Sequence, residues 1–373
     1  MRISDRYIGK QVLLGTLYAV MVLGIVLVLG RLFKEIQPLL VDLKAPPEIV
    51  LRFIINTLPV SLTYTVPWGF LTAVLIVFGR LSSGHEITSF RVAGISLPRL
   101  AAPVFLIGAG LSLISLWLNV SIVPNAKTSL REMLFDQAKR DPSSLLKPGV
   151  VIGDKYFKSD DDRTPRLLIE GKSEGWVEGF HAYFLPNSKN IAGTSREMLY
   201  VHAAKAALSA NQEKGQLVLK LQDAYTETRD AKGEISMGFA GEAEPVVFNL
   251  KTSNKKIRPS TMTNEAIRWE LAASEKPEEK RKLQLLSEIT SRYSFSAACF
   301  AFAFIAVPLG LQTRRRDSSK GLILSLVIGT GYFLITMLAD QVKDPILAKI
   351  TLWSPNVLCV LLGLILFRRA RFK

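Results

Sequence analysis

Six long stretches without a charged residue constrain this chain of 373 residues more than any other feature. The first, residues 12–30, has nineteen positions, close to the ~20 residues that a helix needs to cross ~30 Å of hydrocarbon. The other five are 53–79, 100–123, 293–311, 321–339 and 350–367. The last is short unless Trp353 lies in the interfacial layer, where tryptophan is favoured. We therefore expect a helical membrane protein with six spans, three before residue 124 and three after residue 292.

The region between the two sets of spans has a different character. It contains short apolar runs interrupted by charged residues, such as Arg166–Glu170 and Gln216–Leu221. Turn signals such as Pro148-Gly149 separate these runs. Several short strands with this spacing are typical of a β-sandwich or barrel-like domain.

The expected organisation has three parts. Residues 1–123 carry three spans, residues 124–288 form the β-rich domain, and residues 289–373 carry three more spans. Within the second part, residues 264–288 predict a charged helix that leads back to the membrane and is interrupted at Pro277.

The basic residues indicate which side of the membrane each loop faces. Segments 1–11, 79–99, 312–320 and 368–373 together hold fourteen basic and three acidic residues. The short loops on the other side, 31–52 and 340–350, hold six basic and five acidic residues. Since lysine and arginine concentrate in cytoplasmic loops, both termini are expected in the cytoplasm and the β-rich domain outside it. The same asymmetry explains most of the net charge of +15 without any need for nucleic acid.

The sequence gives little support to an enzyme. Gly171-Lys172-Ser173 resembles the end of a phosphate-binding loop, but Arg166 stands where that loop needs its first glycine. The three histidines are scattered, and no paired-cysteine motif is present. Cys299 and Cys359 lie within spans, where cysteine is usually a small apolar packing residue. We expect no catalytic residue, no metal and no cofactor in this chain.

The loop between the second and third spans is the most informative one. Ser83, with Glu86 three residues later, forms a capping-box pattern, and Gly94 suits a helix C-terminus. The pattern predicts a short cytoplasmic helix over about 83–94. Such a helix could dock into the groove of a partner, or Glu86 could simply cap a connecting helix; spacing alone leaves both interpretations open.

Several segments in order resemble one family. They are Gly79-Arg-Leu-Ser-Ser-Gly-His-Glu-Ile-Thr-Ser-Phe-Arg-Val-Ala-Gly-Ile-Ser96, Arg6-Tyr-Ile8, Arg196–Lys205, Ser287–Arg292, Val307-Pro-Leu-Gly310 and Trp353-Ser-Pro-Asn356. Together they resemble the LptF/LptG (YjgP/YjgQ) lipopolysaccharide-export permeases over nearly the whole chain.

The resemblance assigns a role to the loop of the second and third spans. It implies a coupling helix that engages a separate LptB-type ATPase dimer, with Glu86 seated in the ATPase groove. Ile87, Phe90 and Arg91 would be supporting contacts. ATP and Mg²⁺ would be bound by that partner.

The resemblance also implies that basic residues near the outer end of the first span face the transport cavity. Arg31 and Lys34 lie one turn apart there and could pair with phosphates of a lipid headgroup. Arg52 and Arg292 are weaker candidates. Snorkelling to the membrane interface explains such residues equally well, so this alternative stays open.

The implied protein is one permease half of a lipopolysaccharide exporter in a bacterial inner membrane. Its partners would be a homologous LptF or LptG subunit, the ATPase, and LptC- and LptA-like periplasmic proteins. The periplasmic domain would be jellyroll-like, with Leu167–Ile169 and Leu217–Leu221 on a face that shelters acyl chains. Two alternatives remain: a permease for another lipid or a lipoprotein, and a membrane-anchored scaffold of an envelope complex.

Overall fold

The structure is a computed structural model. It describes residues 3–31, 33, 47–140, 149, 151, 157–158, 163–173, 176–186, 198–211, 216–229, 234–242, 246–250, 258–273, 279–312, 318–339, 341–342 and 344–371. The chain folds into two compact units. One comprises Met1–Gln37, Pro46–Leu130 and Arg258–Lys373, and the other comprises Pro38–Ala45 and Arg131–Ile257. We describe each unit by itself.

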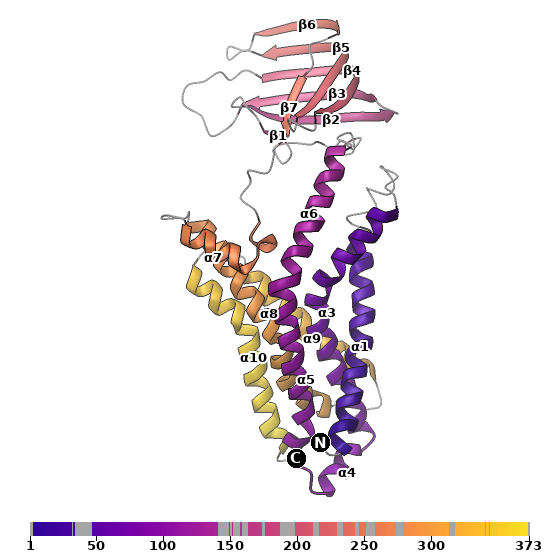
Figure 1. Cartoon of the computed structure of the whole chain (residues 1–373), viewed down its shortest axis with the longest axis vertical. Helices are drawn as coiled ribbons and strands as arrows, with labels where there is room; N and C mark the ends of the chain where they lie inside the picture. Colours follow the sequence, from indigo (N-terminus) through magenta and orange to yellow (C-terminus); the bar gives the residue numbers. More distant parts are fainter. Residues whose placement is uncertain are drawn as a thin grey trace. The chain divides into compact units, whose positions relative to one another are not determined.

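Six apolar helices long enough to cross a membrane dominate the first unit, as predicted (Figure 1). The first three spans are α1 (Ile3–Arg31), α3 (Pro47–Ser83), and α5 (Leu97–Trp117), which continues through a π-helical turn η2 (Leu118–Ile122) into α6 (Val123–Arg140). The last three are α8 (Glu279–Gln312), α9 (Ser318–Ala339) and α10 (Pro345–Arg371). Pro59 and Pro67 lie inside α3 and do not end it, as expected for a membrane helix.

The centre of this bundle is formed by α3 and α8, which are largely buried, whereas α1, α9 and α10 expose most of their apolar surface. Small residues allow the helix backbones to approach closely. A Cβ on Gly310 would lie 2.7 Å from the Cβ of Phe78, and one on Gly363 would lie 2.5 Å from the Phe304 carbonyl carbon. The exposed apolar helices suit contact with lipid or with a second membrane subunit.

A short helical hairpin connects the chain back into the fourth span. It consists of the 3₁₀ turn η4 (Pro259–Thr261), the amphipathic α7 (Asn264–Ala273) and the first turns of α8. Arg281 of α8 holds Glu270 of α7 through two hydrogen bonds of 2.8 and 3.1 Å. Thus the charged segment predicted over 264–288 is helical on both sides of Pro277, which itself lies outside the described residues. Its second half belongs to the helix of the fourth span.

The second unit contains the predicted all-β insertion between the third and fourth spans. Its described strands form one antiparallel sheet with the order β1-β7-β5-β4-β3-β2, and β6 pairs with β5. The strands are β1 (Phe157–Lys158), β2 (Arg163–Ser173), β3 (Trp176–Pro186), β4 (Met198–Asn211), β5 (Gln216–Arg229), β6 (Ile235–Glu242) and β7 (Val246–Leu250).

A line of irregular positions crosses the middle of this sheet. The register omits Glu170, Gly179, Ala204 and Asp223 on four successive strands. Gly179 and Asp223 have left-handed φ values of 59° and 52°, and the register is the same on both sides of the line, so no residue is inserted there. The inward side chains on both sides of this line form one buried cluster, which includes Leu167, Ile169, Leu219 and Leu221.

Candidate functional site

The loop between α3 and α5 carries the short helix α4 (Glu86–Val92), at the same end of the bundle as both chain termini (Figure 1). The predicted stop at Gly94 is confirmed. Gly94 has φ 79°, its N–H donates to Arg91 O at 2.9 Å, and the N–H of Ile95 donates to Phe90 O at 3.0 Å. These two bonds form a Schellman motif, which turns the chain sharply into α5.

The predicted capping box at the start of α4 is wrong. Helix α3 continues to Ser83, whose hydroxyl donates to Arg80 O at 3.0 Å, so Ser83 is the last residue of the preceding helix. His85 then takes a left-handed φ of 58° and serves as the N-cap without a side-chain hydrogen bond. The helix therefore covers seven residues, fewer than the range of about 83–94 that was expected, and Glu86 is its first residue. The Glu86 carboxylate is left available for other partners.

The side chains of α4 divide into two groups. Ile87 is buried and Phe90 is half-buried, and both pack against the main apolar cluster of the bundle. Arg91 and Val92 are exposed. The Glu86 carboxylate accepts a hydrogen bond from the Tyr7 hydroxyl, with 3.0 Å between Tyr7 Oη and Glu86 Oε2. The bundle thus fixes α4 through Ile87 and Phe90 and presents Glu86 and Arg91 at its surface.

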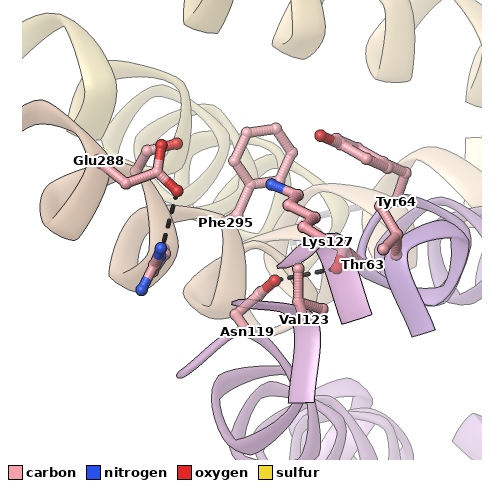
Figure 2. A pocket seen from close by; sticks show the side chains of 10 residues that line it. Thr63, Tyr64, Asn119, Val123, Lys127, Glu288 and Phe295 are labelled. Atoms are coloured by element: carbon pink, nitrogen blue, oxygen red, sulfur yellow. Dashed lines mark hydrogen bonds and ion pairs between the residues drawn. The ribbon is translucent and has the colours of Figure 1, made fainter. Parts of the chain in front are cut away.

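The other end of the bundle holds a small polar cavity of about 90 Å³ between α3, the α5–α6 span and α8 (Figure 2). It is lined by Val60, Thr63, Tyr64, Asn119, Val123, Lys127, Glu288, Ser291, Arg292 and Phe295. Its floor is a buried hydrogen-bond chain: Thr63 donates to Asn119 Oδ1 at 2.9 Å, and Asn119 Nδ2 donates to Ser296 Oγ at 3.1 Å. Because Asn119 lies in the π-helical turn η2, the irregular turn presents this amide to the cavity.

Lys127 is the cation at the centre of this site. Figure 2 shows its side chain extending between Tyr64 and Phe295. Burial acts on its ammonium group more strongly than the charges of Glu288, Arg292 and Arg31 do. Glu288 and Arg292 line the cavity with Lys127, whereas Arg31, at the end of α1 opposite to Tyr7, does not. Two cations and one acid in the cavity wall make this end of the bundle suited to an anionic group.

The structure places the predicted headgroup residues in different surroundings. Arg292 is 6% exposed and donates to Glu288, Asn264 and the carbonyls of Pro259 and Met262, at 2.7–3.2 Å. Arg52 forms an exposed ion pair with Glu48 at 2.7 Å. Arg31 is half-buried, and Lys34 lies outside the described residues.

Of the cavity residues, only Arg292 was predicted, and Lys127 and Tyr7 are the most important residues of the two sites that were missed. Lys127 is the first charged residue after the third apolar stretch, so its position in the sequence was a usable signal. Tyr7 gave no such signal, because its partner Glu86 is 79 residues away. Among the residues that the structure describes, no cluster of histidine, cysteine or acidic side chains could hold a metal ion.

Six apolar helices, with a small polar cavity between three of the spans and a short helix in a basic loop, define a polytopic helical membrane protein. A family model described as the lipopolysaccharide export system permease LptF/LptG matches residues 6–369, nearly the whole chain. The chain therefore belongs to this family of inner-membrane permeases. The curated proteins searched contained no match to the sequence.

Proposed function

We propose that this chain is a permease subunit of a transporter that extracts lipopolysaccharide from the inner membrane and passes it to a periplasmic bridge. A separate cytoplasmic ATPase supplies the energy, and that ATPase binds ATP and Mg²⁺. The observation that carries this proposal is the family match over residues 6–369.

The orientation in this proposal rests on charge. Both termini and α4 are cytoplasmic, and the β unit is periplasmic. The basic segments 1–11, 79–99, 312–320 and 368–373 support this orientation, since cytoplasmic loops are rich in lysine and arginine. The position of α4 at the same end as both termini is consistent with it (Figure 1).

The ATPase docks on α4 in this proposal. Glu86 provides a carboxylate for a cation in the groove of the ATPase, and exposed Arg91 supports the contact. Ile87 and Phe90 hold the helix in place from below, because they pack against the bundle. Because α3 and the Schellman turn fix both ends of α4, a displacement of α4 by the ATPase reaches the bundle without unfolding the helix.

The lipid phosphates bind at the opposite end. Arg31 and Lys127 are the cations that we place first in this role, with Lys34 beside Arg31 in the sequence. Arg292 stabilises the cavity wall instead of binding phosphate, because its N–H groups donate to acceptors of the protein itself. Arg52 is a peripheral candidate, since Glu48 already balances its charge at the surface.

A homologous LptF or LptG subunit completes the cavity against the exposed apolar faces of this bundle. LptC- and LptA-like proteins continue the route from the β unit, whose inward apolar residues, including Leu167 and Leu219, shelter acyl chains.

The proposal is tested by purifying the chain from its native membrane in detergent and identifying the co-purifying proteins and lipids by mass spectrometry. We expect an ATPase, a second six-helix subunit and lipopolysaccharide. An ATPase together with a different lipid would favour the alternative of another lipid permease. Envelope proteins without any ATPase would favour the scaffold.

A further inference from the structure

We propose that Tyr7 is a positioning residue that joins α1 to the coupling helix α4, so that α1 moves with Glu86 and carries Arg31 with it. This inference rests on the proposed function. It assigns to α1 the task of linking ATPase docking at one end of the bundle to the phosphate-binding cations at the other.

The link begins with the hydrogen bond from the Tyr7 hydroxyl to Glu86 Oε2. A hydrogen bond to an ionised carboxylate is stronger than one between neutral groups. A carboxylate offers about four acceptor positions on its two oxygens. Tyr7 uses one of these positions, so Oε1 can still accept from a cation of the ATPase. The same carboxylate can therefore hold α1 and the ATPase at once.

Apolar packing places the start of α1 and the coupling helix in the same core. Ile8 and Val12 of α1 are buried in the main apolar cluster of the bundle, which also contains Leu81 of α3 and Ile87 of α4. Arg80, near the end of α3 that leads into α4, donates from its guanidinium to Gln11 Oε1 at 2.6 Å. A displacement of α4 therefore acts on α1 directly through Glu86 and Tyr7, and indirectly through the end of α3.

The outer half of α1 is free to respond. The helix also contacts α3 closely in its middle, where a Cβ on Gly69 would lie 2.7 Å from Val20 Cγ2. Beyond that contact, Val28 is the buried residue of α1, and an added Cβ at Gly24 or Gly30 would meet no atom within 4 Å. This half is held to the bundle weakly along its length.

The helix itself transmits the displacement. It is continuous from Ile3 to Arg31, and at 1.5 Å per residue the distance along it from Tyr7 to Arg31 is about 36 Å. A small tilt at the Tyr7 end therefore becomes a larger movement of Arg31 relative to Lys127. Changing the separation of these two cations changes how well they hold one phosphate group.

The test uses the full complex in lipid nanodiscs, with a spin label on Gly24→Cys. This position has free space for a label, and the native Cys299 and Cys359 are buried. The spectrum of the spin label is compared with and without ATP and vanadate. The comparison is made in the otherwise wild-type chain, in Tyr7→Phe and in Tyr18→Phe. Tyr18 is the matched control, because it lies on the same helix and is exposed.

We expect Tyr7→Phe to keep the ATPase bound while the nucleotide-dependent change of the label falls about tenfold, the effect of one hydrogen bond to a charged group on a two-state equilibrium. Tyr18→Phe should match wild type. In a Glu86→Gln background, Tyr7→Phe should reduce the nucleotide-dependent change of the label much less, since the charged acceptor is already lost.

Two results would overturn the link. An unchanged label response in Tyr7→Phe would separate α1 from α4, and loss of the ATPase from Tyr7→Phe would make Tyr7 part of the docking surface instead. If the wild-type chain brings down no ATPase at all, the proposed function fails and not only the role of Tyr7.

Discussion

Arg292 donates a hydrogen bond of 2.7 Å to the side-chain oxygen of Asn264, which lies 28 residues earlier in the chain. The same guanidinium also holds Glu288 and two backbone carbonyls of the turn before α7. It thus joins the helical hairpin of α7 to the fourth span. Because the pair is buried, its role is structural first, whatever the chemistry of the neighbouring cavity.

The first prediction concerns this contact. Arg292→Ala leaves several buried acceptors without a donor and should lower the free energy of unfolding by about 2–4 kcal/mol. Arg52→Ala removes an exposed ion pair and should cost less than about 1 kcal/mol. Thermal unfolding in detergent compares the two variants. Equal melting temperatures would show that the α7 hairpin does not depend on Arg292.

The second prediction concerns ATPase docking. Glu86→Arg places a cation where the proposed partner also carries one, so repulsion should abolish co-purification of the ATPase. Glu132→Arg, an exposed acid on α6, is the control and should leave co-purification intact. Pull-down from detergent extracts measures both. Retention of the ATPase by Glu86→Arg would remove the docking role of α4.

The third prediction concerns the proposed headgroup site. Arg31→Glu combined with Lys34→Glu should reduce photocrosslinking to lipopolysaccharide while the assembled complex stays intact. Lys127→Gln alone should weaken crosslinking about tenfold, because a hydrogen bond to a phosphate is charge-assisted. Undiminished crosslinking in the Arg31→Glu Lys34→Glu variant would assign both residues to snorkelling at the interface.

The fourth prediction concerns the line of irregular positions across the β sheet. Gly179 has φ 59°, and a Cβ there would lie 2.5 Å from a carboxylate oxygen of Glu170. Gly179→Ala should therefore destabilise the β unit by about 1–3 kcal/mol. Gly241→Ala meets no atom within 4 Å and is the control. Limited proteolysis of the β unit under increasing urea distinguishes the two variants, and equal protection would show that position 179 tolerates a side chain.

The features that sequence predicted well are those with a local cause. A charge-free stretch of about 20 residues specifies a membrane span by itself, so all six spans were predictable. Gly94 ends α4 because its own backbone angle suits the turn. The apolar runs around Leu167 and Leu219 lie on strands, and short apolar runs bounded by charges and turn signals are a local strand signal.

The features that sequence missed have causes distant in the chain. Ser83 and Glu86 match a capping box, but α3 packs so extensively that its helix continues to Ser83. Arginine is a residue type that often binds anionic ligands, so the sequence suggested that role for Arg292. Only the fold brings Asn264 and two backbone carbonyls within hydrogen-bond distance of its side chain. The pairing of Tyr7 with Glu86 likewise depends on how α1 packs against α3. Packing between helices decides which polar groups meet, and no local pattern records it.

In the proposed function, this chain moves lipopolysaccharide towards the periplasm with energy from a partner ATPase. The most direct test reconstitutes the purified complex in liposomes with lipopolysaccharide and a soluble periplasmic acceptor carrying a photocrosslinker. We expect crosslinks between the acceptor and lipopolysaccharide that accumulate with ATP and not without it, and that disappear in Glu86→Arg. Transfer that is independent of ATP, or that serves phospholipid equally well, would contradict it.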